Sequence, residues 1–302
     1  MNKLSTMTVA AAQYGVEFLG DWATYARKLE RMVATAANAD AQVLVFPEYA
    51  CLELASLFSA DVYTHLHKQL SVLQECLPDY VRLHRDLAEQ YGVYIVASSF
   101  PIQLTDGTFR NRAYFCAPDG AFDFQDKLMM TRFENEIWQI SPGNEIKLFA
   151  TPYGNIGITI CYDAEFPLIA RRQVELGAHV LLTPSCTDTV AGYNRVRIGC
   201  RARALENQCY VVMAPVVGAI DWSPALDINI GAAGVYTPVD VGFPGDGILA
   251  MGELNASQWV IAELDLSRIE QVRHTGQVLN YRDWDRQPYH QALGAVSPRM
   301  LA

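Results

Sequence analysis

The amino-acid sequence predicts an α/β fold in which two sheets pack face to face and are covered by helices. Short apolar runs of strand-forming residues alternate with helical segments of 12 or more residues, a pattern typical of sheets flanked by helices. The two halves of the chain also resemble each other. NADAQVLVFPEY (38–49) is similar to LGAHVLLTPSC (176–186), and GVYIVASS (92–99) is similar to QCYVVMAP (208–215). This repeat indicates two half-domains of one plan, although buried parallel strands resemble one another in any case.

The individual elements follow from length and apolar pattern. The predicted strands are Val9–Gln13, Val43–Phe46, Val93–Ser98, Ala113–Cys116, Ile156–Ile160, Val180–Thr183 and Tyr210–Ala214. The predicted helices are Asp21–Asn38, Leu70–Tyr91, Leu168–Leu176 and Tyr193–Glu206. From Pro224 the pattern is less regular. Val235–Val239 and Trp259–Leu264 are weaker strand candidates, and a short helix is expected after Ser267.

Composition limits the classes of function. The 302 residues contain no linker-like stretch, so residues 1–302 are predicted to form a single domain. A net charge of −10 argues against a nucleic-acid partner. Met1–Ser5 does not resemble the start of a signal peptide, and no run of 18 apolar residues indicates a membrane span. The seven cysteines are odd in number and lack C-x-x-C spacing, so we expect no disulfide framework, no metal site and a cytoplasmic location.

Cys161 is the first candidate for chemistry. It follows the predicted strand Ile156–Ile160 and begins the run CYDAEFP, which leads into another helix. A strand-to-helix turn presents a side chain at the carboxyl edge of a sheet, where α/β ligand sites form. The next backbone N–H groups point the same way and can receive an oxyanion. Position alone leaves Cys161 either a nucleophile or another buried thiol.

A cysteine nucleophile needs a base, and no histidine has a compelling position. His65, His67 and His84 lie in a polar helical stretch and are expected at the surface. A carboxylate must therefore act as the base. Glu48 is the best candidate, because it leaves the strand Val43–Phe46 through Pro47. The alternative is an ordinary solvated loop acid.

Lys127 ends a third strand-like run, Phe122–Asp126. A lysine in an acyl-transfer pocket would supply positive charge to a tetrahedral oxyanion. The alternative is a surface lysine, which is the usual case.

Three sequence blocks now carry a family resemblance. FPEY around Glu48, DKLMMTRFENEIWQISPG from Asp126 and GITICYDAEFPLIARRQVELGAHVLLTPS around Cys161 resemble the signature blocks of the nitrilase (carbon–nitrogen hydrolase) superfamily. Their order matches the Glu, Lys, Cys order of that family. RARALENQCYVV (201–212) is similar to the helix and strand that follow the cysteine block. The resemblance covers a core of about residues 7–264, and the tail 265–302 is expected at a subunit interface.

The resemblance implies a four-layer αββα sandwich without a metal or an organic cofactor. It implies that Glu48 is the general base, Cys161 the nucleophile, and Lys127 the oxyanion donor together with the Tyr162 backbone N–H. Amidase-type members have a second acid after the lysine. The spacing to Pro142–Gly143 favours Glu136 for that position, with Glu134 as the alternative.

The expected reaction is hydrolysis of the C–N bond of a small-molecule amide through a cysteine thioester, releasing ammonia or an amine. CYDAEFP resembles the amidase side of the family, since nitrilases usually carry Trp-Glu after the cysteine. A nitrilase or an N-carbamoyl amidohydrolase is the alternative. An N-acyltransferase is less favoured, because that branch of the family is often embedded in a membrane and no membrane segment is expected here. A non-catalytic binding protein is less favoured, because all three catalytic residues are present. A homodimer or a higher homo-oligomer is expected.

The residues expected to contact the substrate are Tyr49, Glu134, Tyr162 and Glu165. Family members acting on dicarboxylic monoamides often carry Arg where this chain has Glu165. We therefore expect neutral or amine-bearing amides to be preferred. The alternative is that Glu165 caps the next helix or pairs with Arg171 or Arg172.

Overall fold

The computed structural model describes residues 6–287, which fold around a curled sheet of fourteen strands. The main path of the sheet runs β4-β5-β3-β2-β1-β10-β9-β8-β7, and the remaining strands pair at its margins. The strands are β1 (Thr6–Gly15), β2 (Val43–Val45), β3 (Tyr94–Val96), β4 (Phe100–Gln103), β5 (Phe109–Cys116), β6 (Phe122–Asp126), β7 (Leu148–Ala150), β8 (Asn155–Ile158), β9 (Val180–Ser185), β10 (Tyr210–Ala219), β11 (Ile228–Asn229), β12 (Gly234–Tyr236), β13 (Ile248–Met251) and β14 (Gln258–Asp265).

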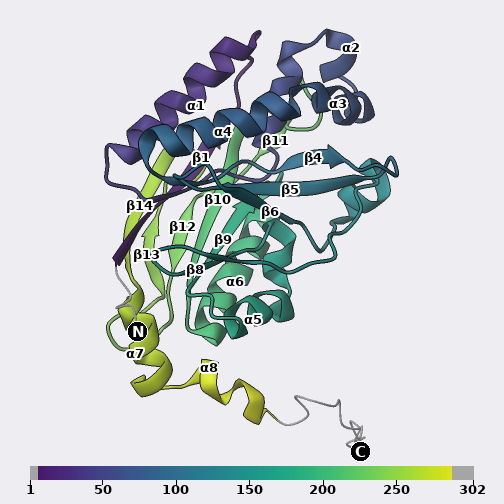
Figure 1. Ribbon diagram of the computed structural model, residues 1–302. Helices are drawn as coiled ribbons and strands as arrows, with labels where there is room; N and C mark the ends of the chain where they lie inside the picture. The colour runs from purple at the N-terminus through teal and green to yellow at the C-terminus, as the bar shows by residue number, and fades with distance from the viewer. Residues whose placement is uncertain (1–5, 288–302) are drawn as a thin grey trace, which may run out of the picture.

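Helices flank the sheet, and short helical turns follow several strands. They are α1 (Trp22–Ala37), η1 (Ala50–Leu57), α2 (Ala60–Tyr63), α3 (Leu66–Val72), η2 (Leu73–Cys76), α4 (Leu77–Tyr91), η3 (Phe133–Trp138), η4 (Cys161–Glu165), α5 (Pro167–Glu175), α6 (Val190–Asn207), α7 (Leu266–Thr275), α8 (Asn280–Asp283) and η5 (Trp284–Arg286). Helices α1 and α4 cover the first half of the sheet, and α5 and α6 cover the second half (Figure 1).

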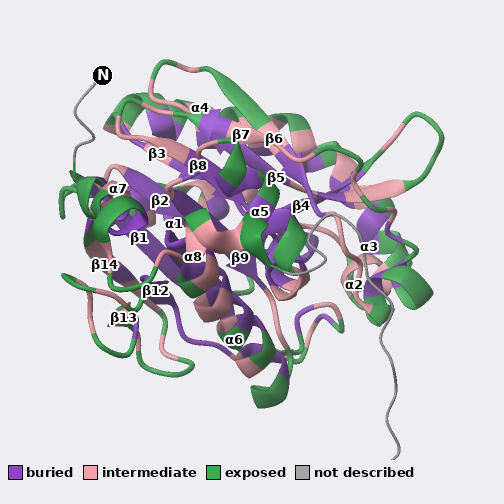
Figure 2. Cartoon of the chain, turned by 90° about the horizontal axis from the view of Figure 1, so that it is seen from below, coloured by how far each residue is buried: buried purple, intermediate pink, exposed green. Residues whose placement is uncertain are grey.

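The layers follow from the alternation of side chains along a strand. On β1, Val9 and Ala11 belong to the apolar cluster that contains strands β9 and β10, whereas Ala10 and Ala12 pack with α1 and α4. The two halves of the sheet therefore face each other across one apolar layer, and each has helices on its outer side. Figure 2 shows the buried strands enclosed by helices whose outer surfaces are exposed. The predicted αββα arrangement is confirmed.

The two expected sheets are joined into one continuous sheet. Strands β1 and β10 run parallel and pair only at their ends, Tyr14 with Val216 and Gly15 with Val217. This short pairing joins the two halves of the sheet, which face each other.

The segment predicted as one helix over Leu70–Tyr91 is divided into α3, η2 and α4. Pro78 lies in the first turn of α4. Proline is tolerated there because the first N–H groups of a helix have no partner within it, whereas in a helix interior it breaks the hydrogen-bond ladder. The surface position expected for His84 is wrong, because this side chain is buried against Phe46 and Tyr80.

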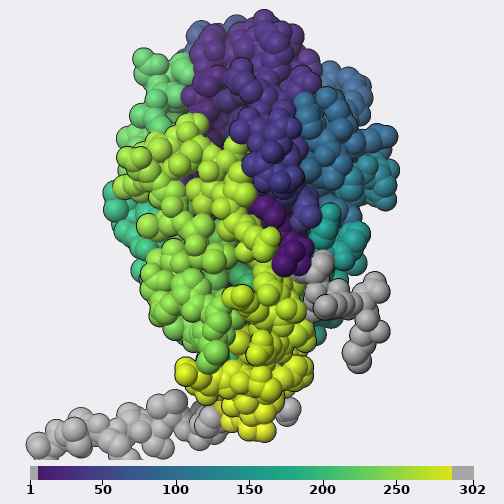
Figure 3. Space-filling model, turned by 90° about the vertical axis from the view of Figure 1, so that its left-hand side faces the viewer, coloured from purple at the N-terminus to yellow at the C-terminus, as the bar shows by residue number. Residues whose placement is uncertain are grey.

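The described part of the tail packs on its own chain at one end of the molecule (Figure 3). Arg171 on α5 donates to the Tyr281 carbonyl at 3.1 Å, and the Arg273 guanidinium lies 4.4 Å from the centre of the Tyr281 ring. The predicted subunit interface of residues 265–302 remains a prediction, and residues 288–302 lie outside the described part. Within residues 6–287, no helix has both the length and the apolar character that crossing a membrane requires.

Candidate active site

Cys161 lies at the turn between β8 and η4, as the sequence predicts. Its backbone has a φ of 49°, in the left-handed region that a residue with a side chain rarely adopts. The side chain is buried, and its Sγ lies 3.7 Å from the Cys186 carbonyl oxygen. A thiol is thus presented on a strained turn at the carboxyl edge of the sheet.

Asp163, two residues further, is a buried side chain that the sequence reasoning did not single out. Its Oδ2 accepts a hydrogen bond from the Ile160 N–H at 3.0 Å, within the cysteine turn. Its Oδ1 accepts from Leu128 at 3.1 Å and from Met129 at 2.8 Å, just after the lysine. One carboxylate therefore contacts both turns. The sequence signal for it would have been an acid close behind a cysteine at a strand exit.

Lys127 follows β6 and is fully buried, so the surface alternative is wrong. Its Nζ lies 2.7 Å from Oε1 of Glu48 and 2.5 Å from Oε2 of Glu134. The lysine carbonyl accepts from the Gly143 N–H at 2.7 Å. A Cβ at Gly143 would lie 2.8 Å from the Asp126 Cβ, so this close approach requires a glycine.

The acid beside the lysine is Glu134, and the expectation that Glu136 takes this position is wrong. Glu134 is buried in η3 and also accepts from Thr131, through its N–H at 3.0 Å and its hydroxyl at 2.9 Å. Glu136 is half exposed and forms a two-pronged ion pair with Arg132, at 2.8 Å for each contact. The segment Phe133–Trp138 is a π-helical turn. Side chains two residues apart on a helical turn point away from each other, so only one of the two acids can face inward, and sequence spacing does not reveal which.

Glu48 follows β2, and its carboxylate is buried, so it is not a solvated loop acid. Asn111 on β5 joins it to the second acid: the Asn111 Nδ2 donates to Glu48 Oε1 at 2.8 Å and to Glu134 Oε1 at 3.2 Å. The Tyr49 hydroxyl donates to the same Glu134 oxygen at 2.9 Å. Asn111 could not be singled out from the sequence, because nothing marks a polar residue within a strand as part of a site.

Burial and charge move the pKa values of the two carboxyls in opposite directions. Burial raises the pKa of Glu48, against the opposing Lys127 charge, and the Glu134 charge adds to the rise. Burial also acts to raise the pKa of Glu134, but Lys127 and the Thr131 hydrogen bonds outweigh it and lower that pKa. Glu134 is therefore the carboxyl that stays ionised, and Glu48 the one that exchanges a proton more readily.

The thiol and the ammonium are shifted as well. Burial, with the Glu48 charge adding to it, raises the pKa of Cys161 well above its usual range, so the thiol is protonated at neutral pH. Burial acts to lower the pKa of Lys127, but Glu134 and Glu48 outweigh it and raise that pKa, so the amine is charged. A protonated thiol thus lies beside a carboxyl able to take its proton and a fixed positive charge.

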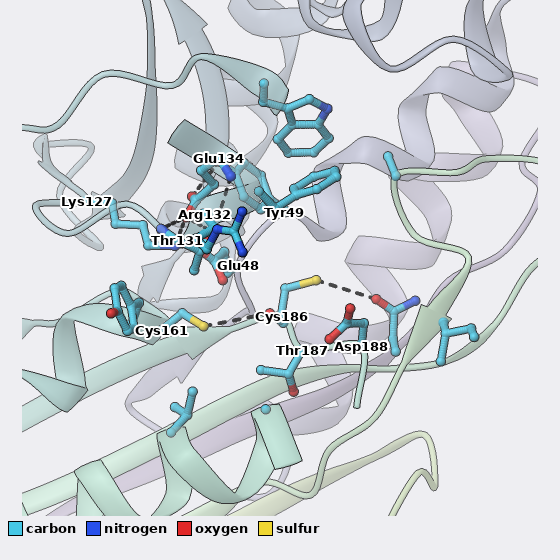
Figure 4. Close-up of a pocket in the computed structure, with 18 of the residues that line it drawn as sticks. Glu48, Tyr49, Lys127, Thr131, Arg132, Glu134, Cys161, Cys186, Thr187 and Asp188 are labelled. Atoms are coloured by element: carbon cyan, nitrogen blue, oxygen red, sulfur yellow. Dashed lines mark hydrogen bonds and ion pairs between the residues drawn. The ribbon is translucent and has the colours of Figure 1, made fainter. Parts of the chain in front are cut away.

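These groups open into a cavity of about 540 Å³ (Figure 4), a size typical of small-molecule sites. Its wall is formed by Glu48, Tyr49, Lys127, Thr131, Arg132, Phe133, Glu134, Trp138, Cys161, Tyr162, Glu165, Cys186, Thr187, Asp188, Gly192, Arg195, Val196, Pro224, Ala225, Asp227, Ile228 and Asn229. All the residues predicted for the site line this cavity except Glu136. Sequence reasoning did not single out Cys186, Asp188 or Asp227.

Glu165 lines the cavity and lies 3.7 Å from the Arg195 guanidinium. Its suggested pairing with Arg171 or Arg172 is wrong, since both of these arginines pair with Glu175. Across residues 6–287, no group of three or more His, Cys, Asp or Glu side chains is arranged to hold a metal ion.

Known proteins are similar to this chain in sequence and in fold. Residues 8–274 match the family described as carbon-nitrogen hydrolase. The chain is 34% identical over 282 residues to the probable hydrolase YhcX of Bacillus subtilis. The matched stretch covers 93% of this chain but only 54% of that relative, so the chain spans about half of the relative's length. It is 27% identical to omega-amidase NIT2 of Danio rerio, over 72% of this chain and 83% of that one. The fold is similar to that of Saccharomyces cerevisiae Nit3, a member of branch 10 of the nitrilase superfamily, with a TM-score of 0.68, 24% identity, and coverage of 90% and 96% of the two chains.

Proposed function

The chain belongs to the carbon–nitrogen hydrolase family, and we propose that it hydrolyses the C–N bond of a small amide through a thioester on Cys161. One observation carries the proposal: the Glu48 carboxyl, the Lys127 ammonium and the Cys161 thiol line one cavity of about 540 Å³, and Glu48 and Lys127 are in direct contact. Together they supply a base, a positive charge and a nucleophile, which are the groups that acyl transfer requires.

The first half of the reaction forms the thioester. Glu48 takes the proton from Cys161 as the sulfur attacks the amide carbonyl carbon. The carbonyl oxygen becomes an oxyanion, which accepts hydrogen bonds from Lys127 and from the Tyr162 N–H. When the C–N bond breaks, Glu48 returns the proton to the departing nitrogen. Ammonia or an amine leaves, and the acyl group remains on sulfur.

The second half releases the acid. Glu48 takes a proton from a water molecule as the water oxygen attacks the thioester carbonyl. The same donors hold the second oxyanion. When the C–S bond breaks, the sulfur recovers a proton and the carboxylic acid leaves. Each proton that Glu48 takes is returned, so the site is restored.

Glu134 holds the lysine charge in place in this scheme. The short contact to Glu134 fixes the Lys127 ammonium and leaves Glu48 free to exchange its proton. One preorganised oxyanion donor lowers a barrier by about 3–4 kcal/mol. Because the raised pKa of Cys161 keeps the thiol protonated, a base is needed at the moment of attack rather than beforehand.

The test is ammonia release from a panel of small amides, carbamoyl compounds and nitriles, measured on the wild type and on Cys161→Ala. We expect release from amides and none from the variant. Release from nitriles alone would indicate a nitrilase, and release from carbamoyl compounds alone would indicate an N-carbamoyl amidohydrolase. Transfer of the acyl group to an added amine in preference to water would make it an acyltransferase. Tight binding of an amide without turnover would indicate a non-catalytic protein.

We further propose a homo-oligomer in which α5 and α6 contact a second copy. Four apolar side chains on these helices are exposed, and contact with a second copy would remove their apolar surface from water. They are Leu168, Val190, Ile198 and Leu205. Light scattering after size-exclusion chromatography should give at least twice the 33.6 kDa chain mass. A monomer at micromolar concentration would contradict this proposal.

A further inference from the structure

We propose that Asp163 is a positioning residue that holds the turn carrying Lys127 against the turn carrying Cys161, so that the reactivity of the thiol depends on it. The inference rests on the proposed function in taking Lys127 and Cys161 as partners in the reaction. It assigns Asp163 no contact with the substrate, since this residue does not belong to the cavity wall.

The two partners come from opposite halves of the sheet. Lys127 follows β6, which pairs with β5 in the first half, whereas Cys161 follows β8, which pairs with β9 in the second half. Glu48 and Glu134 fix the lysine ammonium but belong to its own half of the chain. The distance between ammonium and sulfur therefore depends on contacts between the halves at this edge.

Asp163 makes such a contact with one carboxylate. Oδ1 accepts from the two N–H groups that follow Lys127, at 3.1 and 2.8 Å, and Oδ2 accepts from the Ile160 N–H, at 3.0 Å, just before Cys161. The last bond also closes the turn in which Cys161 takes its left-handed backbone conformation. The side chain is 1% exposed, so water does not compete for these hydrogen bonds.

The chemistry of the side chain suits this task. A carboxylate accepts hydrogen bonds on both oxygens, whereas an asparagine amide has one accepting oxygen and one donating nitrogen. Asparagine could serve the lysine turn or Ile160, but not both, because its amide nitrogen would face an N–H donor. Burial raises the pKa of Asp163 to about 7, against Lys127 and the three backbone N–H groups, so the carboxylate is ionised at pH 8.

The matched control is a buried carboxylate of the same kind that contacts neither turn. Glu53 on η1 is fully buried and accepts from Lys28 at 2.8 Å and from the Glu17 N–H at 3.1 Å. Glu53→Gln removes a buried charge and an acceptor, as Asp163→Asn does, but leaves the link between the halves intact.

The experiment is the rate of alkylation of Cys161 by iodoacetamide at pH 8, followed by peptide mass mapping, on wild type, Asp163→Asn and Glu53→Gln. All rates are taken below the unfolding temperature of each protein. We expect Asp163→Asn to react about 10- to 100-fold more slowly, since a displacement near 1 Å can cost about 10²-fold. Glu53→Gln should react like the wild type. A wild-type rate in Asp163→Asn, or equal slowing in Glu53→Gln, would overturn the proposal.

A second variant covers the case in which Asp163→Asn does not fold. Asp163→Glu keeps the charge and both oxygens but moves them by one methylene, so we expect slower alkylation again, and a wild-type rate would overturn the inference. With an amide substrate, both Asp163 variants should lose kcat with little change in KM, because the residue does not touch the substrate. The alkylation rate needs no substrate. If no amide is hydrolysed by the wild type but alkylation still depends on Asp163, the proposed function fails and this inference stands.

Discussion

The Nζ atom of Lys127 lies 2.5 Å from Oε2 of Glu134, with both side chains buried. This contact separates the roles of the two carboxyls beside the lysine. Glu134 has a lowered pKa and stays ionised, whereas Glu48 has a pKa raised chiefly by burial. Two carboxyls whose environments push their pKa values apart are the usual basis for assigning a fixed charge and a base.

Glu134→Gln should therefore impair catalysis, and Glu136→Gln should not. The first substitution removes the charge that holds Lys127, and we expect kcat to fall by about 10²-fold, the scale of losing one oriented oxyanion donor. Glu136, two residues away, pairs only with the exposed Arg132 and serves as the matched control. Steady-state kinetics on both variants check this. Loss of activity in Glu136→Gln with Glu134→Gln unaffected would reverse the assignment.

Lys127→Met should lower both activity and stability, the latter in a pH-dependent way. In the wild type Lys127 lowers the pKa of Glu134, so the pair stabilises the fold above the ordinary carboxyl range, and this stability is lost as pH falls. Without the lysine, two buried carboxylates lack a cation, which costs about 3–5 kcal/mol at pH 8.

The deficit should shrink toward pH 5, because the two carboxyls of the variant then bind protons and no longer carry buried charge. Urea unfolding of wild type and Lys127→Met at pH 5 and pH 8 measures it. Lys127→Arg should not restore activity, since a planar guanidinium does not fit a site built for a compact ammonium. An equal deficit at both pH values would show that the lysine charge is not what stabilises this cluster.

The pH dependence of kcat/KM should report Glu48, and a parallel profile of Asp163→Asn separates it from Asp163, whose pKa burial raises to about 7. Burial raises its pKa, so the base form is lost as pH falls at a value above the ordinary glutamate pKa of about 4.3. The raised pKa of Cys161 means that no fall from thiol ionisation is expected up to pH 9. A profile of kcat/KM from pH 4 to pH 9, with circular dichroism to verify folding, checks both the fall at acidic pH and the absence of a fall up to pH 9. Full activity down to pH 4 would exclude Glu48 as a base with a raised pKa.

We expect the charge of the substrate to affect kcat/KM through Glu165. This carboxylate lines the cavity, whose wall also contains the exposed acids Asp188 and Asp227 besides Arg132 and Arg195. A cationic amide should therefore have a higher kcat/KM than an anionic amide of the same length, and Glu165→Gln should reduce this ratio. Asp86→Asn on α4, outside the cavity wall, is the control for net charge. An unchanged ratio in Glu165→Gln would show that Glu165 serves only its pair with Arg195.

Much of the fold could be predicted, because each buried strand is visible in the sequence as a short apolar run. The runs around Val9, Val43 and Val180 are apolar on both faces, which indicates strands covered on both sides. The joining of the sheets at Tyr14 and Val216 could not be predicted, because it depends on two strands about 200 residues apart meeting only at their ends. Local sequence carries no signal for such a contact.

Some residues of the site could be predicted from the sequence, and others could not. Glu48, Lys127 and Cys161 could be proposed because each follows a strand and the three occur in a family-like order. The choice between Glu134 and Glu136 depended on which side of the turn Phe133–Trp138 faces the site, which spacing does not reveal. Asn111 lies within a strand, and its role as a bridge between two acids exists only once the chain has folded.

The central claim is that Cys161 is the nucleophile, and substoichiometric iodoacetamide labelling with peptide mass mapping tests it most directly. Six other cysteines serve as internal controls, among them Cys186, which lines the same cavity but is hydrogen-bonded to Asn229 rather than to a carboxyl base. We expect Cys161 to be labelled first, because Glu48 takes its proton during the attack, and we expect amide hydrolysis to fall in proportion to its labelling. Preferential labelling of another cysteine, with Cys161 unmodified and activity lost in step with that other label, would contradict it.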